Sequence, residues 1–170
     1  MQDRRKAVFK VGDAELSEHG KGEAYAYSDA RVAQVLGLTK LGCRLVSLKP
    51  GKRAWPKHAH VNNDEMFVIL SGSGRYLLGD EEIAVSAGDI VGAPSGGLET
   101  AHQLIADEGG ELRYLAISSM LEPDIGLYPD SGKFAVFAGE APGGAAGSRT
   151  FHHIGFLADK AGYWDGEETG

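Results

Sequence analysis

The chain has 170 residues, 42% of them hydrophobic, which is enough for one well-filled domain and short for two. Its formal net charge of -7 argues against DNA or RNA as a partner, because binding to phosphates needs a basic surface. No apolar run approaches the roughly 20 residues of a membrane span, and the first residues lack the apolar core of a signal peptide, so we expect a cytoplasmic protein without a membrane partner.

Short apolar runs separated by glycine and proline predict an all-β chain. The 25 glycines and six prolines are spread along the sequence and leave little room for a long helix. The expected strands cover residues 6–11, 31–38, 42–49, 65–72, 74–80, 82–88, 89–94, 101–106 and 112–119. The segments GSG at 72–74 and GDEE at 79–82 fit hairpin turns. Short strands at regular intervals indicate a sandwich or a barrel.

The expected domain organisation has three parts. Residues 1–40 supply N-terminal strands that pack on the barrel or exchange with a partner, and residues 41–120 form the barrel core. Residues 121–170 form a C-terminal extension, because the sequence after Met120 is rich in glycine, proline and alanine and contains no second core. Aromatic residues near the C-terminal end indicate that this extension packs on the barrel.

The residues with the clearest chemistry are three histidines and one glutamate. His58 and His60 are two residues apart, so on an extended chain both imidazoles leave the same face. Residues 62–64 predict a turn that brings Glu65 back beside them, and His102 follows a second turn-rich segment. Any one of these histidines alone would most often be a surface or hydrogen-bonded residue, but their joint spacing favours a metal site.

The type of ligand narrows the choice of ion. Imidazole suits Mn, Fe, Co, Ni, Cu and Zn, whereas calcium and magnesium prefer oxygen. The sequence therefore predicts one divalent transition metal ion bound by four residues: His58, His60, Glu65 and His102. Such a set leaves room for water or a substrate in an octahedral shell, so the site is potentially catalytic.

Two further residues are candidates for substrate binding. The guanidinium of Arg53 offers two parallel donors for a carboxylate or phosphate, although a charge at a strand end is more often simply solvated. Tyr76 is a candidate proton donor or, equally, a core aromatic residue with a hydrogen-bonded hydroxyl. The sequence identifies no catalytic acid or base.

The spacing of the ligand set resembles the cupin superfamily. The first cupin motif is glycine, several residues, His-x-His, three or four residues, glutamate, six residues and glycine; it is matched by Gly51, His58, His60, Glu65 and Gly72. The second motif is glycine, five residues, Pro-x-Gly, a short gap, histidine, three residues and asparagine; it is matched in part by Gly88, Pro94, Gly96 and His102. The gap before His102 is longer than usual, and Ala106 stands where asparagine is usual.

The resemblance covers residues 51–106, and the wider pattern, including YPDSGK and YWDGE, looks like a group of single-domain bacterial cupins. It implies a double-stranded β-helix, the jelly-roll barrel of cupins, and a bound metal. It does not imply one reaction, because this fold hosts many chemistries.

Strand parity makes a prediction about assembly. If Glu65 faces the metal, then Phe67 and Ile69 face the same interior, whereas Met66 and Leu70 point to the other side. Both faces are apolar, so the outer one needs a cover from the N-terminal segment, a second sheet or a partner subunit. We expect a homodimer, as is common among cupins.

Two classes of function remain open. The first is a metalloenzyme that acts on a small polar metabolite, either by Lewis-acid chemistry as an isomerase or lyase, or with Fe(II) as a dioxygenase. The alternative is a non-catalytic protein that binds a small molecule such as a sugar or a hormone-like ligand.

Overall fold

Antiparallel strands make up most of the computed structural model, which describes residues 7–144 and 146–168. The elements of the first half are η1 (Val11–Asp13), β1 (Ser17–Lys21), β2 (Tyr25–Ala30), α1 (Val32–Leu36), β3 (Leu41–Leu48), β4 (Ala59–His60), β5 (Glu65–Ser71), β6 (Ser73–Leu78) and β7 (Glu81–Ser86). Those of the second half are β8 (Ile90–Ala93), η2 (Leu98–Thr100), β9 (His102–Ala106), β10 (Leu112–Ser119), β11 (Asp124–Tyr128), β12 (Lys133–Ala138), η3 (Ala146–Ser148) and β13 (Phe151–Phe156).

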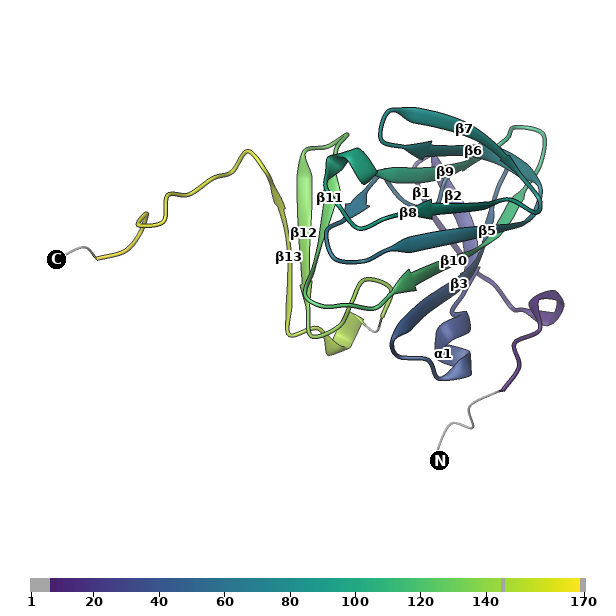
Figure 1. The fold of residues 1–170 in the computed structure, drawn as a ribbon, viewed down its shortest axis with the longest axis horizontal. Helices are drawn as coiled ribbons and strands as arrows, with labels where there is room; N and C mark the ends of the chain where they lie inside the picture. The colour runs from purple at the N-terminus through teal and green to yellow at the C-terminus, as the bar shows by residue number, and fades with distance from the viewer. Residues whose placement is uncertain (1–6, 145, 169–170) are drawn as a thin grey trace.

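The strands form two curved walls around a common interior (Figure 1). One wall is a six-stranded sheet in the order β1-β2-β3-β10-β5-β8. The other combines the sheets β7-β6-β9 and β13-β12-β11-β4, because His58 and His102 pair through both backbone hydrogen bonds and so join β9 to the chain entering β4. This arrangement confirms the all-β prediction and the double-stranded β-helix that the motifs implied.

The core fills the space between the walls. It contains aliphatic and aromatic side chains from both of them, including Val46, Leu48, Phe67, Ile69, Leu104 and Tyr114. On β5 the predicted parity is confirmed, because Phe67 and Ile69 are buried whereas Met66 is 41% exposed. The first residue of β5, Glu65, has the parity of Phe67 and therefore faces the interior.

Two expected strands near the N-terminus are wrong. The segment 31–38 contains helix α1, which packs against β3 and ends at Gly37, a residue with a φ of 71°. A glycine in this left-handed conformation is a common helix end, because its N–H can satisfy the last free carbonyls of the helix. In the expected strand 6–11, residue 6 lies outside the described residues, residues 7–10 form no strand, and η1 begins at Val11.

Several strands do not follow from the apolar pattern. Strand β1 consists of polar residues and glycine, β2 contains Ser28 and Asp29, and β2 extends the six-stranded sheet by pairing with β3. Strands β11, β12 and β13 lie in the part expected to be an extension, and β11 pairs with β4. Within the described residues, no helix has the length and hydrophobicity needed to cross a membrane.

The turn between β5 and β6 explains why the first motif ends in glycine. Gly72 has a φ of +82°, and a Cβ placed on it would lie 1.9 Å from the carbonyl oxygen of Glu111. We expect Gly72→Ala to lower the free energy of unfolding by about 3 kcal/mol, because backbone strain and a steric clash add together.

The matched control is Gly88, whose φ is +98° but whose Cβ position has no neighbour within 4 Å. Gly88→Ala is expected to cost only about 1–2 kcal/mol, the strain of the left-handed conformation alone. Urea denaturation of both variants measures the difference, and equal losses would show that the clash at Gly72 is absent.

Candidate metal centre

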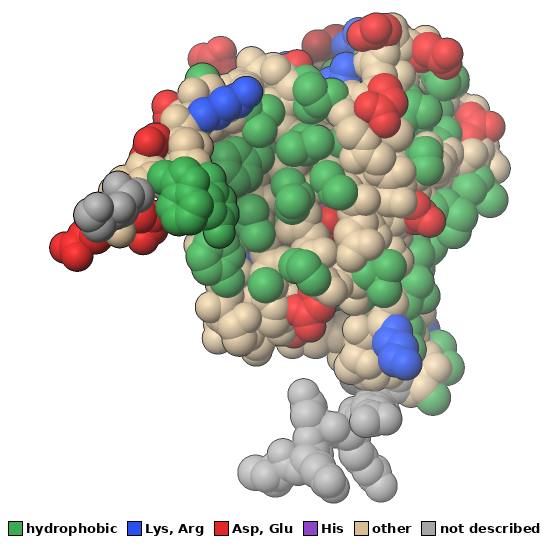
Figure 2. Space-filling model, turned by 60° about the vertical axis from the view of Figure 1, so that its left-hand side comes forward, with side chains coloured by type: hydrophobic (Ala, Val, Ile, Leu, Met, Phe, Trp, Pro, Cys, Tyr) green, Lys and Arg blue, Asp and Glu red, His purple; other side chains and the backbone are tan. Residues whose placement is uncertain are grey.

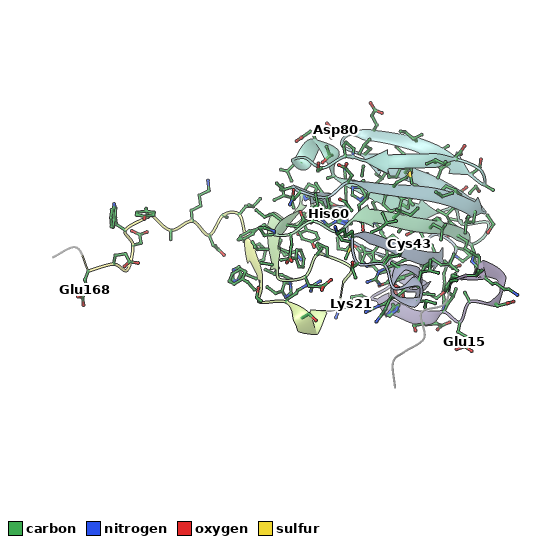
Figure 3. The ribbon with its side chains drawn as sticks, turned by 60° about the horizontal axis from the view of Figure 1, so that its bottom comes forward. Glu15, Lys21, Cys43, His60, Asp80 and Glu168 are labelled. Atoms are coloured by element: carbon green, nitrogen blue, oxygen red, sulfur yellow. The ribbon has the colours of Figure 1, made fainter. Side chains whose placement is uncertain are left out.

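The fold brings the four predicted ligands together from three separate places. His58 and His60 lie at the entry to and within β4, while Glu65 and His102 begin β5 and β9. Oε2 of Glu65 lies 2.8 Å from Nε2 of His102, 3.9 Å from Nε2 of His60 and 4.0 Å from Nε2 of His58. Figure 3 shows His60 inside the body of the molecule, between the walls.

These distances suit a single ion. Bonds from imidazole or carboxylate to an ion such as zinc are about 2.0–2.2 Å, so two ligands of one ion lie up to about 4 Å apart. Candidate ligand atoms of His58, His60 and Glu65 all lie within 4.8 Å of one another, and this group can hold a metal ion.

Each histidine is also oriented through its second ring nitrogen. Nδ1 of His58 lies 2.8 Å from Pro56 O, and Nδ1 of His102 lies 3.2 Å from Thr100 O. Nδ1 of His60 lies 2.7 Å from Asp124 Oδ2. A carbonyl or carboxylate oxygen only accepts, so Nδ1 carries a proton in His58 and His60. Nε2 of all three rings faces the carboxylate of Glu65, to which His102 donates from Nε2 at 2.8 Å.

The protonation states also suit metal binding. Burial is the main cause that lowers the pKa of His58 to about 4, so this ring is neutral at neutral pH. For Glu65, burial alone would raise the pKa, but the hydrogen bond to His102 and the charges of the three histidines outweigh it and lower the pKa to about 2. A neutral imidazole and an ionised carboxylate are the forms that bind a metal.

Asp124 is a site residue that the sequence did not reveal. It begins β11, is 1% exposed, accepts from His60 Nδ1, and accepts from the backbone N–H of Asn62 at 3.0 Å. Burial alone would lower the pKa of His60, but the hydrogen bond to Asp124 and the charges of Glu65 and Asp124 outweigh it, so the pKa is raised. An acidic residue at the start of the apolar segment DIGLY was the available signal.

A cavity of about 490 Å³ opens beside the ligand set. All four predicted ligands line it, together with aromatic and aliphatic side chains that include Trp55, Phe67, Met120 and Phe137. Tyr128 also lines it and stacks on His58 with the ring centres 6.0 Å apart. Burial, with a smaller contribution from the charge of Asp124, raises the pKa of Tyr128, which therefore keeps its proton at neutral pH.

The other two predicted residues have partners of their own. Arg53 donates from Nη1 to Gln103 Oε1 at 3.4 Å, and its guanidinium lies over the ring of Tyr25. Tyr76 is buried in the core, and its hydroxyl donates to Gly92 O at 2.9 Å. Within the described part of the chain, neither residue is among those that line the cavity, whereas Gln103 is.

Comparisons with known proteins agree with this architecture. A candidate sugar phosphate isomerase from Acidithiobacillus ferrooxidans is 21% identical, with a TM-score of 0.75 over 92% of this chain and 96% of its own. A cupin sugar phosphate isomerase from Silicibacter pomeroyi is 19% identical, with a TM-score of 0.66 over 82% of each chain. A predicted oxalate decarboxylase from Thermotoga maritima is 19% identical, with a TM-score of 0.56 over 67% of this chain and 99% of its own. At these identities the likeness shows the fold alone.

No curated protein sequence matches the chain. Residues 44–118 match the sequence profile of the cupin domain, and this range contains all four residues of the ligand set. The profile match identifies residues 44–118 as a cupin domain, and the shared architecture shows that the chain has the cupin fold.

Proposed function

We propose that this cupin binds one divalent transition metal ion through Nε2 of His58, His60 and His102 and the carboxylate of Glu65, and that the centre acts on a small polar metabolite in the adjoining cavity. The observation that carries the proposal is the convergence of three Nε2 atoms on one carboxylate, with Nδ1 of each ring facing a backbone or carboxylate oxygen. Hydrogen-bonded acceptors behind histidine ligands are typical of metal sites.

A bound ion would supply Lewis-acid chemistry for an isomerase or lyase, or a place for dioxygen in an Fe(II) dioxygenase. The names of the structural neighbours, isomerases and a decarboxylase, favour the first of these. The protein side chains have other tasks. Trp55, Phe67 and Phe137 give the cavity apolar walls, and the protonated hydroxyl of Tyr128 offers a hydrogen bond beside them.

Metal analysis followed by activity screening tests this proposal. Protein purified without a histidine tag is expected to contain about one transition metal ion per chain. Turnover of a panel of sugar phosphates and small organic acids is then measured under air and under nitrogen. Turnover without oxygen supports an isomerase or lyase, and oxygen uptake supports a dioxygenase. Saturable binding without turnover would favour the non-catalytic alternative.

We also propose that the protein forms a homodimer through its C-terminal arm, residues 157–168. Figure 1 shows the chain leaving the body after β13, and each hydrogen bond given for residues 159–168 is made within 156–168. On this arm Tyr163 is 86% exposed and Trp164 is 67% exposed. Figure 2 shows hydrophobic side chains grouped on the body beside the arm, a surface that suits the aromatic residues of a second copy.

Tyr163→Ser combined with Trp164→Ser is expected to weaken dimerisation at least about 100-fold, because burial of each large apolar side chain contributes about 1.5–3 kcal/mol. Light scattering after size-exclusion chromatography measures the masses across a dilution series. Val8→Ser is the control, since Val8 is also exposed but lies on the N-terminal segment. A monomeric wild type at micromolar concentration would contradict the proposal.

A further inference from the structure

We propose that Arg149, supported by Arg44, forms an anion-binding subsite in the cavity at a distance from the metal ligands, so that the ligand of this cupin carries a carboxylate or phosphate group beyond an apolar middle section. That the other end of this ligand meets the metal ion rests on the proposed function, whereas binding of the anionic group at Arg149 does not.

The register of the six-stranded sheet places Arg44 on the cavity side. In neighbouring strands Phe67 pairs with Ala116, and Ala116 pairs with Arg44, so these three residues project from the same face. Phe67 is two residues from Glu65 on β5 and has the same parity. With strands about 4.8 Å apart and residues about 3.4 Å apart, the Cα atoms of Arg44 and Glu65 are about 12 Å apart.

Arg149 comes from the opposite wall. Its guanidinium lies over the ring of Phe137, 4.8 Å from the ring centre, and Phe137 on β12 pairs with Asp124 on β11. Arg44 reaches toward the same segment, because its Nη2 donates to Gly143 O at 3.4 Å. Both arginines line the cavity together with Arg31, so three parts of the chain contribute an arginine to its lining.

The charge of Arg44 already has a partner, whereas the charge of Arg149 does not. Arg44 forms an ion pair with the buried Asp29 through Nη1, which holds its side chain in place. Among the described residues, Arg149 and Arg31 form no ion pair within 4.0 Å, and Arg149 Nε is buried without a hydrogen-bond partner. The guanidinium of Arg149 therefore lines the cavity without a carboxylate partner among the described residues, and a carboxylate or phosphate group of a ligand would supply one.

The other residues that line the cavity indicate the chemistry of the middle part of the ligand. Apolar side chains such as Trp55 and Phe137 contribute much of the lining, and the sheet register places Phe67 and Ala116 between Glu65 and Arg44. The only carboxylates in the lining, among the described residues, are Glu65 in the metal centre and Glu140. An organic anion with an apolar middle fits these surroundings better than a fully hydroxylated one, because apolar walls leave sugar hydroxyls without partners.

Two anionic probes and one neutral probe test the subsite: phenyl phosphate, 4-phenylbutyrate and 4-phenylbutanol. Trp55 lines the cavity and reports binding by fluorescence in a Trp164→Phe background, because the chain has two tryptophans. We expect at least one anion to bind about tenfold tighter than the alcohol, and Arg149→Gln to remove this preference without changing the affinity for the alcohol. The probe that shows the preference distinguishes phosphate from carboxylate.

Arg75→Gln is the matched control, because Arg75 is an exposed arginine on β6 that pairs with Glu82 outside the cavity. Arg44 is unsuitable for this purpose, since its removal would leave Asp29 buried without its cation. The titrations are made at pH 8 on protein as purified and again after treatment with EDTA. An anion preference that survives in Arg149→Gln, or that disappears with the metal, would overturn the subsite, whereas a failure of metal binding appears separately in elemental analysis.

Discussion

His60→Ala and Glu65→Ala are each expected to remove most of the bound metal while the barrel stays folded. Each change deletes one of four ligand groups that meet within 4.0 Å of Glu65 Oε2. The loss of affinity should exceed about 100-fold, the upper end for residues that only support metal ligands. Elemental analysis after dialysis measures the metal content, and far-UV circular dichroism checks the fold.

The control for these variants is His153→Ala, because His153 is an exposed histidine on β13 that is distant in sequence from the ligand set. Its metal content should match that of the wild type. Equal metal content in the wild type, His60→Ala and Glu65→Ala would refute the assignment of the ligands.

Asp124→Asn is expected to weaken metal binding by about 10–100-fold at pH 8, although Asp124 does not itself face the ion. The carboxylate of Asp124 accepts a hydrogen bond from Nδ1 of His60, with 2.7 Å between Nδ1 and Oδ2, and so directs Nε2 of His60 toward Glu65. Asparagine keeps the shape and one acceptor but loses the charge that makes the imidazole more basic. A titration with Zn²⁺ against a competing chelator measures the affinity.

The pH profile separates this positioning role from a merely structural one. Protons compete with the metal for Nε2 of His60, so affinity in the wild type should fall by about tenfold per pH unit as the pH drops below the raised pKa of that ring. In Asp124→Asn this pKa is lower, so the fall should begin at a lower pH. An unchanged profile would mean that Asp124 does not act through His60.

The local ligand pattern was predictable because it depends on short-range geometry. The spacing of His58 and His60, the turn before Glu65 and the alternation along β5 each follow from the period of an extended chain. The strand prediction over 31–38 failed because apolar residues in a short run fit one helical turn as well as a strand, and the cap at Gly37 decided between them.

The contacts between distant segments were not predictable from such patterns. Asp124 meets His60 only because β11 pairs with β4, and the composition after Met120 gives little sign of β11, β12 or β13. Arg44 and Arg149 likewise reach one cavity from opposite walls. Nothing in their local sequence distinguishes either of them from a solvated surface charge, because strand pairing places Arg44 and the connection between η3 and β13 places Arg149.

The most direct test of the metal centre is anomalous diffraction from crystals of the untagged protein grown with Mn²⁺, Co²⁺ or Zn²⁺. We expect one anomalous peak in the cavity, about 2.0–2.2 Å from Nε2 of His58, His60 and His102 and from an oxygen of Glu65. A peak elsewhere, or an ion bound by the other three residues with His102 well beyond bonding distance, would contradict a centre built from all four.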